Sequence, residues 1–159
     1  IRAGCEIKIA AKVDPVDQEY FDAKIKPLIR HPLVDFIGEV NHIEKNNLVG
    51  HAKALIFPID WPEPFGLVMI EAMACGTPVV AFRRGSVPEI IEHGITGLIV
   101  ENVDEAILAL PKIESISRLN CRDTFERRFN AEKMVSRYMN VYEKIQKTSA
   151  EISVHSIVA

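Results

Sequence analysis

The sequence predicts an α/β protein in which a doubly wound parallel sheet carries helices on both faces. Short apolar runs alternate along the chain with segments that begin and end like helices, which is the order of βαβ units. Some runs, such as residues 54–57, are apolar at consecutive positions rather than at alternate ones. Strands of that kind are buried on both faces, as in a parallel sheet covered by helices. The expected arrangement is therefore Rossmann-like.

Five segments have the length and composition of buried strands. They are short, mostly apolar and bounded by residues typical of turns. The expected strands are residues 7–13, 34–37, 54–59, 79–82 and 97–100.

The helices are expected from the residues at their ends. Asp14 and Pro15 have the pattern of an N-cap and first position, in a helix that Pro27 should kink or shorten. Another helix follows Pro64 and is ended by Gly-Thr-Pro at 76–78. Pairs of capping residues predict three more: Asn41 with Glu44 for a helix through about Gly50, Ser86 with Glu89 for one that ends at Gly94, and Asn102 with Glu105 for one through about Leu110.

The C-terminal part, residues 117–147, is expected to be an extended helical region. Residues 1–4 resemble the last turn of a helix, so we expect residues 1–147 to form a single domain that is truncated at its N-terminus. Residues 148–159 have no clear periodicity and are expected to form a flexible tail. The basic residues of the helical region are interpreted as a solvated face: Arg122, Arg127, Arg128, Lys133 and Arg137.

The composition argues against several classes of protein. The net charge of −3 gives no reason to expect a nucleic acid or an anionic membrane as partner. No apolar run approaches the ~18 residues that span a bilayer, and no secretory signal opens the chain. Cys5, Cys75 and Cys121 are odd in number and lack a CxxC spacing, which favours free, buried thiols. We expect a cytoplasmic location, with peripheral membrane attachment of the full-length protein left open.

One carboxylate, that of Glu71, stands in a helix with almost no polar face. Ligands of open α/β sheets bind beyond the carboxyl ends of the strands, where the loop 60–66 is expected. Gly66 lets a ligand approach the backbone, and the amides of residues 65–68 are expected to be free for an anion. Glu71 lies about 7.5 Å further along the helix, and its side chain leans back toward the same site.

Glu63 lies on the loop before this helix, so two carboxylates are expected to flank the free amides. A ligand with hydroxyls at both ends and phosphates between them fits that arrangement, and a nucleotide-sugar is such a molecule. The simpler interpretation is that Glu71 reaches solvent at the helix edge or pairs with a buried arginine. The two acids, the Pro-Phe-Gly turn and the position in the sheet together favour a functional site.

The stretch EPFGLVMIE, from Glu63 to Glu71, resembles the E-x7-E motif of the retaining GT-B glycosyltransferases of group 1, often called family 4. Three further segments are similar to the same family: AMACGTPVVA at 72–81, GSVPEII at 85–91 and GITGL at 94–98. FIGEV at 36–40 resembles the family's strand and loop beside the nucleotide base. The resemblance covers most of residues 6–145. It implies the donor-binding, C-terminal half of a GT-B fold, in an enzyme that transfers a hexosyl group from a nucleoside-diphosphate sugar.

The resemblance also implies roles for the matching residues. Glu63 would act in catalysis by holding the hydroxyls of the donor sugar, and Glu71 would accept hydrogen bonds from the ribose. The backbone around Gly66 would contact the sugar and the phosphate through Phe65, Gly66, Leu67 and Val68.

Two other groups of residues keep alternative interpretations. Gly38, Glu39 and Val40 would line the base pocket, although a turn at the end of a strand explains them equally well. Arg83 and Arg84 follow a strand end and could meet a phosphate, but solvated loop arginines are the simpler interpretation.

No cofactor and no metal are expected. No D-x-D motif occurs, and the five histidines show no ligand spacing. The donor would carry UDP, GDP or ADP, and the helix N-terminus with basic side chains would stabilise the leaving group. Family members also have a Gly-Arg…Lys-Gly segment and an N-terminal domain that binds a sugar, lipid or other acceptor. Nothing in this chain matches those parts, so we expect the chain alone to be inactive and to bind its donor weakly.

Two alternatives stay open from the sequence. The chain could be a non-catalytic module that binds a nucleotide-sugar, or a generic Rossmann-like binding domain. No Gly-x-Gly-x-x-Gly follows a strand, which argues against a dinucleotide.

Overall fold

The computed structural model describes residues 1–155, and the side chains of residues 1–148. All its described strands pair in parallel, with helices beside them, so the predicted α/β class is confirmed. β1 (Ile7–Ile9) pairs with β2 (Val34–Phe36), while β4 (Val79–Phe82) lies between β3 (Leu55–Phe57) and β5 (Gly97–Val100). Every expected strand is present, and the first three are shorter than predicted.

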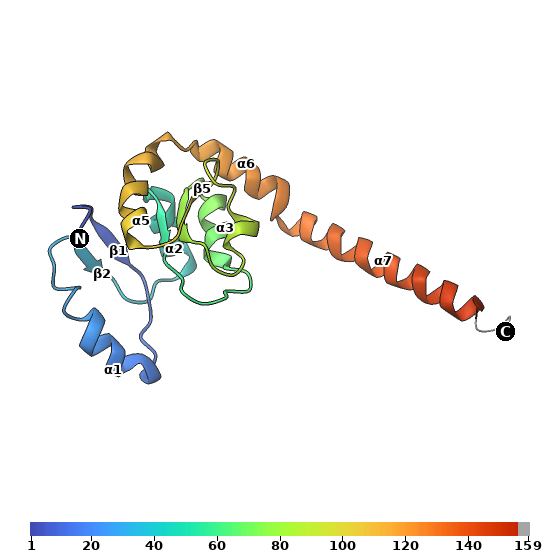
Figure 1. The fold of residues 1–159 in the computed structure, drawn as a ribbon, viewed down its shortest axis with the longest axis horizontal. Coiled ribbons are helices and arrows are strands. Elements are labelled where there is room, and N and C mark those ends of the chain that lie inside the picture. The colour runs from blue at the N-terminus through green and yellow to red at the C-terminus, as the bar shows by residue number, and fades with distance from the viewer. Residues whose placement is uncertain (156–159) are drawn as a thin grey trace.

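Hydrogen bonds divide these strands between two sheets, in the orders β1-β2 and β3-β4-β5. Figure 1 shows β1 and β2 at one side of the molecule and β5 nearer its middle. An open groove of about 810 Å³ lies where the ends of β1 and β3 face each other. Lys12, Phe21, Asp60 and Trp61 are among its lining residues. The five strands, which were expected to form one sheet, are thus divided into two hydrogen-bonded sheets, and β1 does not pair with β3.

Helices cover both faces of the β3-β4-β5 sheet. Val79 and Ala81 of β4 pack in one buried cluster with Met69 and Met73 of α3 (Leu67–Ala74). Val80 belongs to a second cluster, which contains residues of α5 (Val103–Ala109) and of the 3₁₀ segment η3 (Leu110–Ser115). Since consecutive strand residues point to opposite faces, each face of β4 has its own helical cover.

Two of the predicted helix starts are confirmed. At α2 (His42–His51), Oδ1 of Asn41 accepts from the amides of Ile43 and Glu44 at 2.9 and 3.0 Å. Oε2 of Glu44 accepts from the amide of Asn41 at 2.9 Å, which completes the capping box. At α5, Oδ1 of Asn102 accepts from the amide of Glu105 at 3.0 Å.

The first predicted helix is broken into short pieces. A 3₁₀ turn η1 (Pro15–Asp17), the short α1 (Gln18–Tyr20) and a π turn η2 (Phe21–Ile25) follow one another. Asp14 and Pro15 occupy the predicted N-cap and first position, with Asp14 extended, but the Asp14 side chain makes no cap hydrogen bond. The π turn closes with the amide of Lys26 on the carbonyl of Phe21 at 2.8 Å. Pro27 has no amide hydrogen to continue the ladder, which explains why the helix ends there.

The helix expected from Ser86 to Gly94 is only one turn long, α4 (Val87–Ile90), and Ser86 stands at its N-cap position without a side-chain cap hydrogen bond. The backbone of Ser86 is helical (φ −75°, ψ −8°), whereas a capping residue needs an extended backbone. Its carbonyl accepts from the amides of Glu89 and Ile90, as the carbonyl of an N-cap residue does. Its Oγ is buried and has no hydrogen-bond partner among the described residues.

The C-terminal region is helical as predicted, in two helices, α6 (Arg118–Arg128) and α7 (Ala131–His155). Asn130 separates them, and its Oδ1 accepts from the amide of Lys133 at 2.8 Å, like an N-cap of α7. Figure 1 shows α7 projecting away from the rest of the molecule. Part of the expected flexible tail, residues 148–155, is thus helical, and residues 156–159 lie outside the described residues.

The interpretation of the basic residues as a solvated face is wrong for Arg128, which is 26% exposed; Arg122 is 51% exposed but also contacts the protein. Arg122 donates to the carbonyl of Ala74, and Arg128 donates to the carbonyl of Glu89, both at 2.6 Å. The carbonyl of Ala74 is at the end of α3, and that of Glu89 is in the short helix α4. A cation near the C-terminal end of a helix interacts favourably with the helix dipole. Arg127, with its side chain 63% exposed, and Lys133 and Arg137 on α7 are exposed as predicted.

The three cysteines are free, but they differ in exposure. Cys121 is buried, Cys75 is intermediate and Cys5 is exposed, so the expectation of buried thiols is wrong for Cys5. None of the described helices is both long enough and apolar enough to cross a bilayer.

Candidate functional site

The N-terminus of α3 is shaped by Gly66. Its φ of +72° is left-handed, and a Cβ there would lie 2.5 Å from Cε of Met69, so the position requires glycine. The amide of Gly66, expected to be free, donates to Oε1 of Glu63 at 3.0 Å. The amides of Phe65, Leu67 and Val68 have no hydrogen-bond acceptor within residues 1–155. Phe65, just before the N-cap, and Leu67 and Val68 in the first turn of α3 therefore offer three free donors beside a fixed carboxylate.

The open face of α3 explains why an apolar helix carries an acid. Met69, Ala72 and Met73 are fully buried against the sheet, with no exposed surface. Leu67 is 64% exposed, and Glu71 lies one turn further along the same face. Glu71 is thus at the edge of the helix that does not pack on the core.

The carboxylate of Glu71 is paired across the fold with Lys45 of α2. Nζ of Lys45 lies 2.6 Å from Oε1 of Glu71, and the two side chains are 28% and 39% exposed. Two interpretations weighed against function: that Glu71 reaches solvent at the helix edge, which its 39% exposure fits, and that it pairs with a buried arginine. The partner is instead a lysine, and both side chains remain accessible to a ligand.

The backbone of Glu63 is held by the loop that follows β4. The amide of Ser86 donates to the carbonyl of Glu63 at 2.9 Å. A Cβ at Gly85 would lie 2.3 Å from that carbonyl oxygen and 2.5 Å from the amide nitrogen of Glu63. Glu63 therefore depends on a segment about 20 residues away in sequence for its position.

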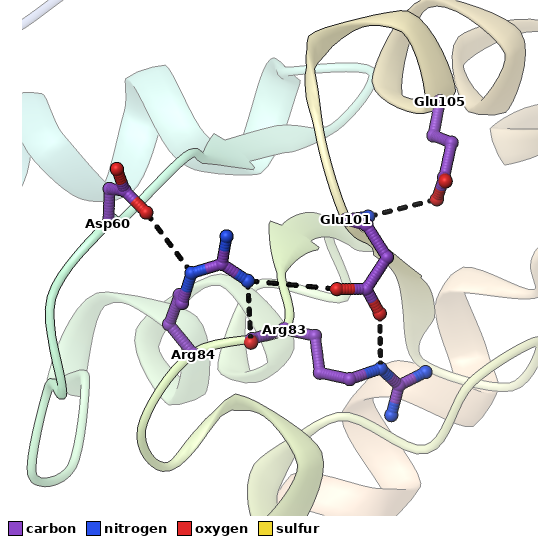
Figure 2. A network of polar contacts seen from close by, with 5 residues as sticks. All are labelled: Asp60, Arg83, Arg84, Glu101 and Glu105. Atoms are coloured by element: carbon purple, nitrogen blue, oxygen red, sulfur yellow. Dashed lines mark hydrogen bonds and ion pairs between the residues drawn. The ribbon is translucent and has the colours of Figure 1, made fainter.

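A network of ion pairs links the ends of the three strands of the β3-β4-β5 sheet (Figure 2). Nε of Arg84 donates to Oδ1 of Asp60 at 3.1 Å, and Nε of Arg83 donates to Oε1 of Glu101 at 2.7 Å. Nη1 of Arg84 lies 3.6 Å from Oε2 of Glu101 and donates to the carbonyl of Arg83. Figure 2 shows Glu101 between the two arginines. Both arginines therefore have acidic partners, and their side chains remain 51% and 37% exposed, as the interpretation of solvated loop arginines expects.

The segment expected to line a base pocket borders a second hollow, of about 600 Å³. Gly38 has a φ of +75°, so the chain turns sharply where β2 ends. Glu39 and Val40 are in the lining of the hollow, whereas Gly38 is not. The other lining residues come from β1, the end of β2 and α2: Lys8, Ile37, Glu44, Asn47 and Leu48.

The titratable groups of the described residues do not gather into a metal site. No group of three or more His, Cys, Asp or Glu within residues 1–155 could hold a metal ion. Three histidines have partners within the protein: Nδ1 of His93 accepts from the amide of Ile99 at 3.0 Å, Nδ1 of His31 accepts from the amide of Leu33 at 3.2 Å, and Nδ1 of His51 lies 2.8 Å from the carbonyl of Asn47.

The sequence model of the family described as "Glycosyl transferases group 1" matches residues 14–133, which is most of the chain. The chain belongs to the group 1 glycosyltransferases. This glycosyltransferase chain is 28% identical over 147 residues to phosphatidyl-myo-inositol mannosyltransferase of Mycobacterium leprae, covering 88% of the chain and 39% of that protein. It is 40% identical over 88 residues to N-acetyl-alpha-D-glucosaminyl L-malate synthase of Bacillus anthracis, covering 50% of the chain and 23% of that protein.

Solved glycosyltransferase structures have the same fold. Sucrose-phosphate synthase from Thermosynechococcus elongatus matches with a TM-score of 0.76 and 24% identity, over 90% of this chain and 39% of that one. HepE of Anabaena in complex with UDP-glucose matches with a TM-score of 0.75 and 22% identity, over 92% of this chain and 43% of that one. The glycosyltransferase chain thus spans well under half the length of these proteins.

Three residues of the site in this glycosyltransferase chain were missed from the sequence. Lys45, Gly85 and Ser86 act through contacts with Glu71 and Glu63 that are remote in sequence. Gly85 and Ser86 lie in the GSVPEII segment that resembles the family, but that resemblance did not connect them to Glu63. For Lys45 the available signal was the unusual acid in an apolar helix, because such an acid needs a partner or a ligand. An acid in an apolar helix indicates that it has a partner or a ligand, but it does not identify Lys45 as that partner.

Proposed function

We propose that this chain is the donor-binding domain of a retaining glycosyltransferase that transfers a hexosyl group from a nucleoside-diphosphate sugar. The observation that carries this proposal is the first turn of α3. Its free amides, at Phe65, Leu67 and Val68, stand between the carboxylate of Glu63 and that of Glu71 on the open face of the helix. Amides at a helix N-terminus bind anionic groups, and carboxylates accept from hydroxyls.

Each part of a nucleotide-sugar has a counterpart in this arrangement. The diphosphate meets the amides of Leu67 and Val68, and the sugar hydroxyls meet Glu63 with the backbone of Phe65 and Gly66. The ribose diol meets Glu71. The base enters the hollow beside Gly38, Glu39 and Val40, whose lining continues onto α2.

The proposed chemistry depends on stabilising the departing nucleoside diphosphate. Negative charge develops on its phosphate as the bond to the sugar breaks, and the free amides with the dipole of α3 stabilise that charge. Oε1 of Glu63 accepts from the amide of Gly66, so the carboxylate is oriented before the sugar arrives. We propose that no metal or cofactor is required, which EDTA treatment tests directly.

Binding experiments test the proposal before any acceptor is known. UDP is the first probe, because HepE of Anabaena was crystallised with UDP and UDP-glucose; GDP and ADP follow. Calorimetry is expected to detect one of the three nucleotides and to lose at least about tenfold in affinity with Glu71→Ala. Binding of none of them, or binding indifferent to that substitution, would favour a generic Rossmann-like domain.

Transfer itself requires the longest form of the protein that its gene encodes. Relatives are more than twice the length of this chain, so we propose that an acceptor sugar, lipid or other molecule is bound by a part not included in it. A panel of nucleotide-sugars on that longest form, compared with the 159-residue chain, measures both donor choice and the expected inactivity of the chain alone. Donor binding without turnover by the longest form would support a non-catalytic module instead.

A further inference from the structure

We infer that Lys45 is a positioning residue that fixes Glu71 for recognition of the nucleotide's ribose. This inference rests on the proposed function. Nothing in the sequence motifs assigns a role to Lys45, which lies on a different helix from the E-x7-E segment and 26 residues away from Glu71.

Lys45 itself is held in a defined place. It lies in the first turn of α2, directly after the capping box of Asn41 and Glu44, and its amide donates to the carbonyl of Asn41 at 2.8 Å. Its neighbours on α2, Glu44, Asn47 and Leu48, line the hollow proposed for the base. The ammonium group thus reaches Glu71 from the helix that also borders the base site.

The pair leaves half of the carboxylate for a ligand. Oε1 of Glu71 takes the 2.6 Å contact with Lys45, whereas Oε2 has no hydrogen-bond partner among residues 1–155. A ribose hydroxyl can donate to Oε2 without breaking the ion pair. Without Lys45, Glu71 would lose the contact that fixes its side-chain rotamer, so a smaller fraction of the protein would hold the carboxylate ready to bind.

A merely structural ion pair is the competing explanation. A partly exposed pair contributes little to stability, and its removal would not distinguish one nucleotide from another. If Lys45 positions Glu71 for the ribose, removing Lys45 should weaken binding only of nucleotides that carry the ribose hydroxyls. The discriminating ligand is therefore 2′,3′-dideoxy-UDP, which lacks them.

The experiment measures the dissociation constants of UDP and 2′,3′-dideoxy-UDP by calorimetry, with GDP or ADP in place of UDP if the first titrations select them. The proteins are wild type, Glu71→Ala, Lys45→Met, Lys45→Arg and, as control, Lys53→Met. Lys53 forms an exposed pair with Glu114 on another part of the surface, so it matches the loss of charge without touching the site.

We expect Lys45→Met to weaken UDP binding by about 5- to 20-fold, as expected for one lost charge-assisted contact. Lys45→Arg restores most of that loss, and Lys53→Met changes nothing. With the dideoxy nucleotide, wild type, Glu71→Ala and Lys45→Met bind alike within about twofold. Circular dichroism verifies the fold of each variant, and Lys45→Gln, which also removes the charge, replaces Lys45→Met if that variant does not fold.

The outcomes separate the two proposals. If Glu71→Ala has no effect on UDP, the proposed function itself is wrong. If Glu71→Ala weakens UDP binding but Lys45→Met does not, only the role of Lys45 is overturned. A Lys45→Met loss that persists with the dideoxy nucleotide also overturns it, because Lys45 would then contact another part of the ligand.

Discussion

The backbone of Glu63 packs against Gly85 so closely that residue 85 has no room for a side chain. A Cβ there would lie 2.3 Å from the carbonyl oxygen of Glu63, and the next residue, Ser86, donates its amide to that oxygen at 2.9 Å. Arg84 binds Asp60 at the start of the same loop. The loop that carries the proposed sugar-binding acid is therefore fixed at two points by residues 84–86.

Gly85→Ala should damage both stability and the site. The new Cβ meets backbone atoms, which cannot move aside like a side chain, and φ at Gly85 is +48°. We expect a loss of about 2–4 kcal/mol in the free energy of unfolding, measured in urea, from strain and overpacking together. Affinity for the donor should also fall, since Glu63 must shift.

Gly94→Ala is the matched control for this prediction. Gly94 has a φ of +81°, but a Cβ there would meet nothing within 4 Å. It should cost only the conformational strain, about 1–2 kcal/mol, and leave donor binding unchanged. Equal effects of the two substitutions would contradict the close packing of Glu63 on Gly85.

Arg118→Met should destabilise the fold at the place where three helices meet. The guanidinium donates to the carbonyls of Gly50 and Ala52, at 2.6 and 2.9 Å, and to Oγ1 of Thr77 at 2.9 Å. Gly50 and Ala52 are at the C-terminal end of α2, Thr77 follows α3, and Arg118 is the first residue of α6. We expect a loss of about 1–3 kcal/mol in the free energy of unfolding, because several charge-assisted hydrogen bonds disappear. Arg137→Met on α7, which is exposed, should change it by less than about 0.5 kcal/mol.

Asn41→Ala should weaken the start of α2. Its Oδ1 accepts from two amides of the first turn, and both would lose their acceptor within the protein. The expected loss in unfolding free energy is about 1 kcal/mol. Asn140→Ala, on the exposed surface of α7, is the control and should have no comparable effect on chemical denaturation.

Cys121 should make stability depend on pH in the alkaline range. Burial raises the pKa of its thiol from the ordinary value of 9.0 to about 11. Because the folded pKa lies above the unfolded one, the contribution is fully present below pH 9.0 and is lost as the pH rises toward about 11. Wild type should therefore lose more unfolding free energy than Cys121→Ala between these pH values. Parallel pH profiles for the two proteins would contradict the buried, protonated thiol.

The sequence by itself predicted the features that are written in neighbouring residues. The order of strands and helices, the capping box of Asn41 and Glu44, and the helix after Pro64 all follow from signals within a few positions. It overestimated Asp14 and Ser86: each residue precedes a helical turn, but neither side chain makes a cap hydrogen bond, and the backbone of Ser86 is helical rather than extended. Residue type alone therefore overestimates caps.

The sequence also determined that two acids and a glycine turn stand at the start of one helix. Only the tertiary structure decided how those acids are held: Glu71 by Lys45, and Glu63 by Gly85 and Ser86. The physical reason is the separation along the sequence over which each kind of interaction acts. Helix caps and apolar periodicity act between residues a few positions apart, whereas an ion pair or a backbone contact forms wherever the folded sheet brings two distant segments together, and no local pattern records that choice.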